Sequence, residues 1–125
     1  MAKLINNVGS FTPDNLFAGQ EIPALVKFVK LKGLQGVVKR GTVLGVITAS
    51  GLAVPVDSSK TDGSQTANAI LIEDIDTSAG DAAAEAYESG HFNRKALIFG
   101  GTDTADKHET KLRELGIFLS DNIAY

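Results

Sequence analysis

Two histidines are the side chains best suited to acid–base chemistry, and neither stands in a catalytic pattern. Nucleophilic catalysis needs a serine or cysteine beside a positioned base, and only His91 and His108 can supply that base in a chain without cysteine. His108 falls on the apolar stripe of a predicted helix, which is typical of a half-buried packing residue. His91 follows a glycine in a predicted hairpin and is expected to be exposed. The histidines therefore predict no catalytic centre.

Three carboxylates form the densest group of potential metal or acid–base ligands, namely Glu73, Asp74 and Asp76. Adjacent side chains of a strand point to opposite faces, so we expect these carboxylates not to converge on one ion. Gly100 and Gly101 lack the other residues of a phosphate-binding loop, and no GxGxxG pattern follows a predicted strand. We expect no catalytic residues, no metal, no cofactor and no small-molecule substrate, and the chain is predicted not to be an enzyme.

The charges are segregated along the chain. The net charge of −3 repels phosphate backbones on average, so we expect no nucleic-acid partner. A basic stretch precedes an acidic one, which is typical of two solvated faces; the alternative is complementary contact between neighbouring subunits. The basic stretch holds Lys27, Lys30, Lys32, Lys39 and Arg40, and the acidic stretch holds Glu73, Asp74, Asp76, Asp81, Glu85 and Glu88.

Length and composition indicate one small domain rich in turns. With 125 residues, 13 of them glycine, and no cysteine, the fold must depend on packing or oligomerisation and not on disulfides. The longest apolar run, residues 43–47, is far shorter than the ~18 residues that span a bilayer. We expect no secretory signal in the first residues, because Asn6 and Asn7 interrupt their apolar stretch. We expect no membrane partner. We also expect the protein to be made in the cytoplasm and to be kept there, or in something assembled there.

Alternating apolar residues predict mainly β structure with one or two short helices, an α+β class. Within residues 24–32 the alternation slips between Phe28 and Val29, which indicates a bulge or a strand covered on both faces. A helix is predicted from Ala105 to Leu115, with Asp103, Thr104 or Asp106 as the candidate N-cap and a stop at Gly116. Asp106 and Glu109 also form a capping-box-like pair. Further strands are expected at residues 41–48, 52–56, 69–72 and 117–119, with a hairpin-like turn at residues 49–51 and a polar loop at 57–65.

One internal stretch supports two predictions. Residues 81–86 have strong helix propensity with an aspartate at the start. However, Tyr87 and Phe92 flank a Ser89-Gly90 turn, which resembles a hairpin tip whose return strand would be residues 95–99.

The first 22 residues carry large apolar side chains at spacings that fit neither a strand nor a helix. This irregularity predicts an extended arm that is too polar to fold alone but can dock against another protein. The alternative is one or two strands packed on their own domain. The predicted organisation is an arm at 1–22 and a β-rich domain at 23–125. The apolar residues of the arm include Leu4, Ile5, Val8, Phe11, Leu16 and Phe17.

Several of these features occur together, in order, in one known family. The chain resembles the head decoration proteins of tailed phages, of the lambda protein D type, in four segments. These are residues 39–45, the Asp62-Gly63 loop before residues 69–72, the 87–94 segment and the late helix ending Leu115-Gly116-Ile117. The resemblance covers about residues 39–119, whereas residues 1–38 match only through an extended arm leading to a first strand.

The resemblance implies a β-clip-like fold, in which residues 82–88 form a strand. It also implies a homotrimer on the outer surface of the assembled head, at its three-fold positions, in a virion assembled in the host cytoplasm. The arm would add extended backbone to strands of the major capsid protein, and the trimer would stabilise the head against the pressure of packaged DNA. The residues expected to bind the capsid are Phe11, Leu16, Phe17, Ile22 and Pro23.

Two rival functions have different sequence requirements. A trimeric β-clip enzyme of the dUTPase kind would need an aspartate and a tyrosine in nucleotide-binding motifs, and no stretch resembles those motifs. A virion fibre or receptor-binding module would tend to show repeats or exposed aromatic clusters, whereas this chain has no tryptophan and 2 tyrosines.

Overall fold

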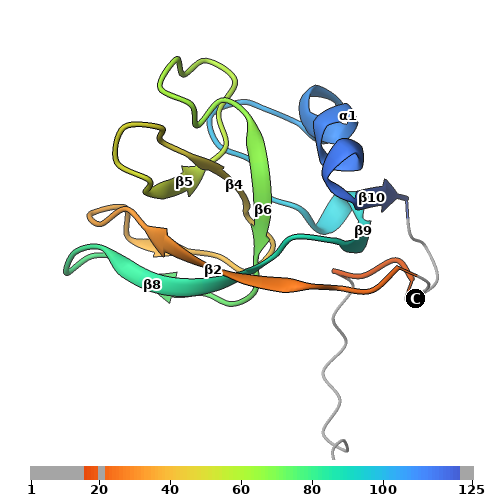
Figure 1. Cartoon of the computed structure of the whole chain (residues 1–125), viewed down its shortest axis with the longest axis horizontal. Helices are drawn as coiled ribbons and strands as arrows, with labels where there is room; N and C mark the ends of the chain where they lie inside the picture. The colour runs from red at the N-terminus through yellow and green to blue at the C-terminus, as the bar shows by residue number, and fades with distance from the viewer. Residues whose placement is uncertain (1–15, 20–21, 122–125) are drawn as a thin grey trace, which may run out of the picture.

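Five strands close into a barrel that makes up one half of the computed structural model (Figure 1), which describes residues 16–19 and 22–121. Neighbouring strands around the barrel follow the order β2, β5, β4, β6, β8 and back to β2. All pairs are antiparallel except β2 with β5, which meet at Leu31 and Ala53 alone. The strands are β2 (Val26–Leu31), β4 (Val43–Val46), β5 (Ala53–Pro55), β6 (Ala67–Leu71) and β8 (Ala82–Tyr87).

The other half contains the α-helix and a small parallel sheet beside the barrel (Figure 1). β9 (Gly90–Asn93) pairs in parallel with β10 (Ile117–Ser120), and α1 (Ala105–Leu115) leads into β10. A 3-10 turn at Arg94–Ala96 follows β9. A separate short pair, β3 (Val37–Val38) with β7 (Ile75–Asp76), packs on the barrel side. The described residues are mainly β with one α-helix and one 3-10 turn, so the predicted class is confirmed. Within these residues, no helix is long and apolar enough to span a membrane.

Each half has its own hydrophobic core. The barrel encloses the first cluster, in which large residues such as Leu31 and Leu44 pack against alanines at 53, 69, 84 and 86. Small side chains suit the inside of a five-stranded barrel, because it leaves little room between strands. The second cluster lies between the barrel, α1 and the β9–β10 sheet, and it includes Ile70, Phe92, Leu112 and Ile117.

The first predicted strand is present, but without the expected bulge. β2 pairs with β8 in continuous register from Val26 to Leu31. Lys27, Val29 and Leu31 lie on the less exposed face, whereas Val26, Phe28 and Lys30 are exposed. The slip in the alternation therefore reflects apolar residues on the outer face and not a bulge.

The predicted hairpin after β8 is wrong. Residues 82–87 form a strand, as the family resemblance implied, because their pairing with β2 outweighs their helix propensity. β9 does not return along β8 but pairs with β10, a strand far along the chain. Gly90 adopts φ 144° where the chain leaves the barrel. The expected return strand, residues 95–99, is partly the 3-10 turn, and Ile98 forms one bridge to Thr42.

α1 spans the predicted residues, and its N-cap is one of the three predicted candidates. Gly116 ends the helix in the left-handed conformation, with φ 97°, as predicted. The N-cap residue is Thr104, whose side chain makes no capping hydrogen bond. The expected capping box of Asp106 and Glu109 is not formed, because the carboxylate of Glu109 binds Arg94 instead.

The basic and acidic stretches lie side by side within the chain. β2 pairs with β8, and β3 pairs with β7, so that each basic segment is next to an acidic one. The Arg40 N–H donates to Asp74 at 2.7 Å, and the Gly33 N–H donates to Asp81 at 2.8 Å. Both donors are main-chain groups. Charged side chains of the two stretches meet at Lys39 and Asp74, whose Nζ and carboxylate oxygen are 4.0 Å apart.

Candidate functional site

Residues 16–18 form the root of the predicted arm, and they lie against β9. The Asn93 N–H donates to the Leu16 carbonyl at 2.6 Å, and the Ala18 N–H donates to the His91 carbonyl at 2.9 Å. Phe17 forms an antiparallel bridge with Phe92. This segment is therefore joined to the edge of the β9–β10 sheet by one isolated bridge, so the root packs on its own domain without forming a further strand.

An aromatic cluster holds this root in place. The Phe17 ring stacks on Phe92 at a centroid distance of 5.0 Å and meets the edge of Tyr87 at 5.1 Å. Phe92 is fully buried, and Leu16 retains 3% of its surface in the same core. Burying side chains of this size stabilises the fold by about 1.5–3 kcal/mol each. Leu16 and Phe17, two of the predicted capsid-binding residues, thus pack into the core of their own subunit.

The chain beyond the root borders a small surface hollow of about 210 Å³, lined by Phe17, Gly19, Ile22, Pro23 and Ala24. Ile22 is partly buried and Pro23 is exposed. Three of the predicted capsid-binding residues are therefore together at one site, whereas Phe11 lies outside the described residues.

Ser89 fixes the chain on the far side of the hollow, where β2 begins. The Ser89 hydroxyl donates to the Pro23 carbonyl at 2.7 Å and accepts from the Leu25 N–H at 3.1 Å. This role of Ser89 had no sequence signal, because a serine in a turn looks the same whether or not it binds a distant segment.

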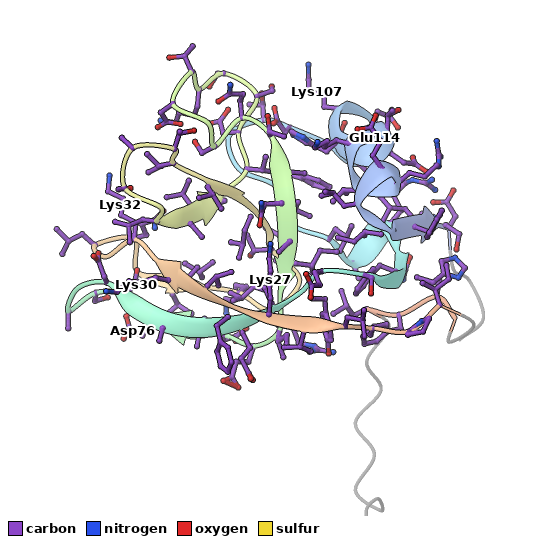
Figure 2. The ribbon with its side chains drawn as sticks, viewed as in Figure 1. Lys27, Lys30, Lys32, Asp76, Lys107 and Glu114 are labelled. Carbon is purple, nitrogen blue, oxygen red and sulfur yellow. The ribbon has the colours of Figure 1, made fainter. Side chains whose placement is uncertain are left out.

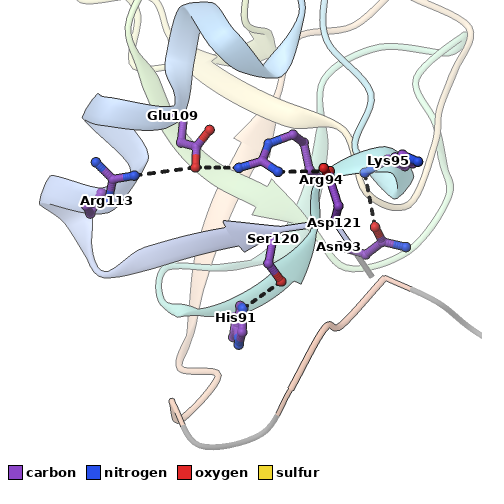
Figure 3. Close-up of polar contacts among 8 residues, drawn as sticks. All are labelled: His91, Asn93, Arg94, Lys95, Glu109, Arg113, Ser120 and Asp121. Carbon is purple, nitrogen blue, oxygen red and sulfur yellow. Dashed lines mark hydrogen bonds and ion pairs between the residues drawn. The ribbon is translucent and has the colours of Figure 1, made fainter. Parts of the chain in front are cut away.

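An ion-pair network anchors the end of β10 beside β9 and α1 (Figure 3). The Arg94 guanidinium donates to Glu109 at 2.6 Å and to Asp121 at 2.9 Å, and Arg113 lies 3.4 Å from the same Glu109 oxygen. These hydrogen bonds raise the pKa of Arg94, and the one to Glu109 has the largest effect. The network ties Asp121, the last described residue, to the body of the protein.

His91 is part of the same sheet and is less exposed than predicted. Its Nε2 lies 2.9 Å from the Ser120 hydroxyl, so it links β9 to β10 (Figure 3). The parallel pairing of the two strands brings His91 opposite Phe118, two residues before Ser120. Its place in the sheet indicates a structural contact.

His108 is buried and not half-buried as predicted, and its partner is a carboxylate. Its Nε2 lies 2.7 Å from Asp103, and its ring stacks on Phe99 with centroids 5.6 Å apart. The Ser58 hydroxyl donates to the other Asp103 oxygen at 2.7 Å. In this arrangement the serine binds the carboxylate and not the histidine. It is therefore not the nucleophile–base pair that acyl transfer requires.

Burial by itself would raise the pKa of Asp103, but its hydrogen bonds act in the opposite direction and prevail. Donors from His108 and Ser58 stabilise the carboxylate, and the pKa falls to about 2. The ionised Asp103 links the loop at residues 57–60 to the start of α1. Sequence reasoning missed this contact, since Ser58 and Asp103 are far apart along the chain.

The clustered carboxylates have structural partners nearby. Asp74 accepts a hydrogen bond from the Arg40 N–H, and Lys39 lies 4.0 Å from its other oxygen. Asp76 accepts hydrogen bonds from the hydroxyl and the N–H of Ser78, and these bonds lower its pKa. Across residues 16–19 and 22–121, no three histidine or carboxylate side chains gather in a way that would hold a metal ion.

The comparison with protein families accounts for most of the chain. The model of the bacteriophage lambda head decoration protein D family matches residues 8–118, which includes the end of the predicted arm, the root and the whole barrel. A search of curated proteins returned no match. Since the family match extends over far more than half of the sequence, the chain belongs to the bacteriophage lambda head decoration protein D family, and it is a structural head protein of a phage virion.

Proposed function

We propose that the protein binds as a homotrimer to the outer surface of the assembled phage head and stabilises it against the pressure of packaged DNA. In this proposal residues 1–22 reach the major capsid protein, and residues 23–125 form the body. The protein acts by binding and catalyses no reaction, in keeping with a structural family. The host cytoplasm is the proposed place of assembly.

The observation that carries this proposal is the anchored root of the arm. Two main-chain hydrogen bonds and the buried Leu16 hold residues 16–18 on β9. A segment that starts from a fixed point searches a smaller volume, so it loses less entropy when it docks. Leu16 and Phe17 then act mainly by positioning the contacts, while Phe11, Ile22 and Pro23 supply apolar surface to the capsid protein.

The energetics favour three arms over one. An arm that becomes ordered on binding gains main-chain hydrogen bonds but loses conformational entropy, so a single arm binds weakly. Three arms on one trimer act at a high effective concentration, and the trimer then dissociates rarely. Because the trimer would bind the assembled shell and not separate capsid subunits, mass action stabilises the shell.

The test is a truncation that leaves the root intact. A variant lacking residues 1–15 retains Leu16 and the whole described body, so its melting temperature should match that of the full chain. We expect it to lose cosedimentation with undecorated phage heads. A second variant, Ile22→Ser, Pro23→Ala in the full chain, changes part of the proposed contact and should bind heads more weakly without complete loss. Undiminished binding by the truncated variant would refute the role of the arm.

A further inference from the structure

The outer face of the β2–β8 ribbon carries the most exposed run of large apolar residues among the described strands. Phe28 is 81% exposed, and the neighbouring Leu25 and Val26 are 57% and 45% exposed. The ribbon runs along the lower side of the barrel in Figure 1, away from α1. Val26 and Phe28 lie on one face because side chains alternate along a strand. A continuous apolar face of this kind is typical of a contact with another protein.

Charges of both signs flank the Phe28 ring, one on each strand. Glu85 of β8 lies directly opposite Phe28, and Lys30 is the next outward residue of β2, opposite Ala83. Lys30 and Glu85 are both exposed, and neither forms an ion pair with a described residue. The face therefore carries an apolar centre with a free cation on the β2 side and a free anion on the β8 side.

β2 also has an open edge, on the side away from β8. The Glu88 N–H donates to the Leu25 carbonyl at 2.8 Å, so the main-chain groups of Leu25, Lys27 and Val29 point to β8. Those of Val26, Phe28 and Lys30 point the other way, where β5 reaches only Leu31. A hollow of about 510 Å³ lies along this edge, between residues 27–30 and the β4–β5 hairpin. Proteins usually cover or protect such an edge.

We propose that this face is where one subunit contacts a second copy of the same chain, with Phe28 at the centre. The inference rests on the homotrimer of the proposed function and names its contact surface. Around a three-fold axis, Lys30 on the β2 side of one subunit meets Glu85 on the β8 side of the next. Such a head-to-tail contact closes into a ring. A second copy is the occupant because the patch supplies both members of the complementary charge pair.

The test measures the number of chains per particle by analytical ultracentrifugation across micromolar concentrations. We expect three for the wild type. Phe28→Ser, Lys30→Glu and Glu85→Lys should each raise the concentration at which the trimer dissociates by about tenfold or more. The double variant Lys30→Glu, Glu85→Lys restores opposite charges across the interface, so it should recover most of the loss.

Two control variants match these changes elsewhere on the surface. Leu34→Ser removes another exposed leucine, 83% exposed in a loop, and Lys107→Glu reverses a charge on α1, away from the ribbon (Figure 2). Both should leave the trimer intact. Circular dichroism should show that every variant is folded, since the changed residues are exposed.

The outcomes separate this inference from the proposed function. A wild type that remains a monomer would overturn the trimer itself. A wild-type trimer that persists in Phe28→Ser and in both charge variants would overturn the interface alone. Loss of head binding by those variants with an intact trimer would also overturn it, because the face would then contact the capsid protein. If the trimer of the double charge variant dissociated at concentrations as high as those of the single variants, the Lys30–Glu85 pairing would be contradicted.

Discussion

The Nε2 atom of His108 lies 2.7 Å from an Asp103 carboxylate oxygen, and both side chains are almost completely withdrawn from solvent, at 4% and 2% exposed. Because Asp103 is ionised over the neutral range, the carboxylate accepts and the histidine Nε2 carries the hydrogen. Ser58 donates to the same carboxylate through its N–H and its hydroxyl. The carboxylate is thus the centre of a contact that joins the loop at residues 57–60 to the first turn of α1.

This contact predicts a specific loss of stability in acid. The pKa of Asp103 falls from its ordinary value of 3.8 to about 2 in the folded protein. Ionised Asp103 therefore stabilises the fold above about pH 4, and this contribution disappears as the pH falls toward 2. Asp103→Asn should lower the free energy of unfolding at pH 7 by about 1–3 kcal/mol. The difference from wild type should shrink between pH 4 and pH 2, measured by urea unfolding.

Asp62→Asn is the control for that experiment, because the exposed Asp62 carboxylate accepts hydrogen bonds from the N–H and the hydroxyl of Ser64 in the same turn. Its effect should remain within about 0.5 kcal/mol. A stability difference for Asp103→Asn that stays constant down to pH 2 would contradict the role given to the ionised carboxylate.

Two apolar residues of the predicted arm should respond differently to truncation. Leu16 is buried in the second core cluster, so Leu16→Ala should lower the free energy of unfolding by about 2–5 kcal/mol. Phe11→Ala should leave stability unchanged and weaken binding to undecorated heads, as the proposed capsid contact requires. Urea unfolding and head cosedimentation of both variants make the comparison. Equal stability of Leu16→Ala and wild type would show that the root does not hold the body together.

The Arg94 network should contribute more than an ordinary surface ion pair. Arg94 and Glu109 are only 26% and 21% exposed and lie 2.6 Å apart. Arg94→Met should therefore cost about 1–3 kcal/mol of unfolding free energy, because Glu109 loses a charged hydrogen bond in a partly buried place. Lys111→Met is the matched control, since Lys111 pairs with Glu114 at 3.8 Å in a largely exposed position. Lys111→Met should lower the free energy of unfolding by at most about 0.5 kcal/mol. Equal losses in the two variants would mean that partial burial does not strengthen the Arg94 ion pair.

Local patterns were sufficient to predict the elements whose stability is local. The helix from Ala105 to Leu115 and its stop at Gly116 are present as predicted, because helix hydrogen bonds and a left-handed cap involve only neighbouring residues. The tight turn of the β4–β5 hairpin is similar, with Gly51 at φ 76°. The family resemblance, carried by the order of such local motifs, is confirmed by the match over residues 8–118.

Contacts between distant segments decided the rest. The helix propensity of residues 82–86 yields to the pairing of β8 with β2, since a whole ladder of hydrogen bonds outweighs a weak local preference. The hairpin after Tyr87 does not form, because β9 pairs with β10, a strand that follows the helix in the sequence. Glu109 does not take part in the predicted capping box. It binds Arg94, a residue that local spacing along the chain does not bring near.

The sequence alone therefore determined the class of fold, the helix and the family, because these follow from local hydrogen bonding and from the order of motifs along the chain. Only the tertiary structure decided that Leu16 belongs to the core with Phe17 packed against it, and that Phe28 lies exposed between charges of both signs. Burial depends on which distant residues arrive beside a side chain, and apolar spacing along one strand does not reveal which of its faces is left uncovered.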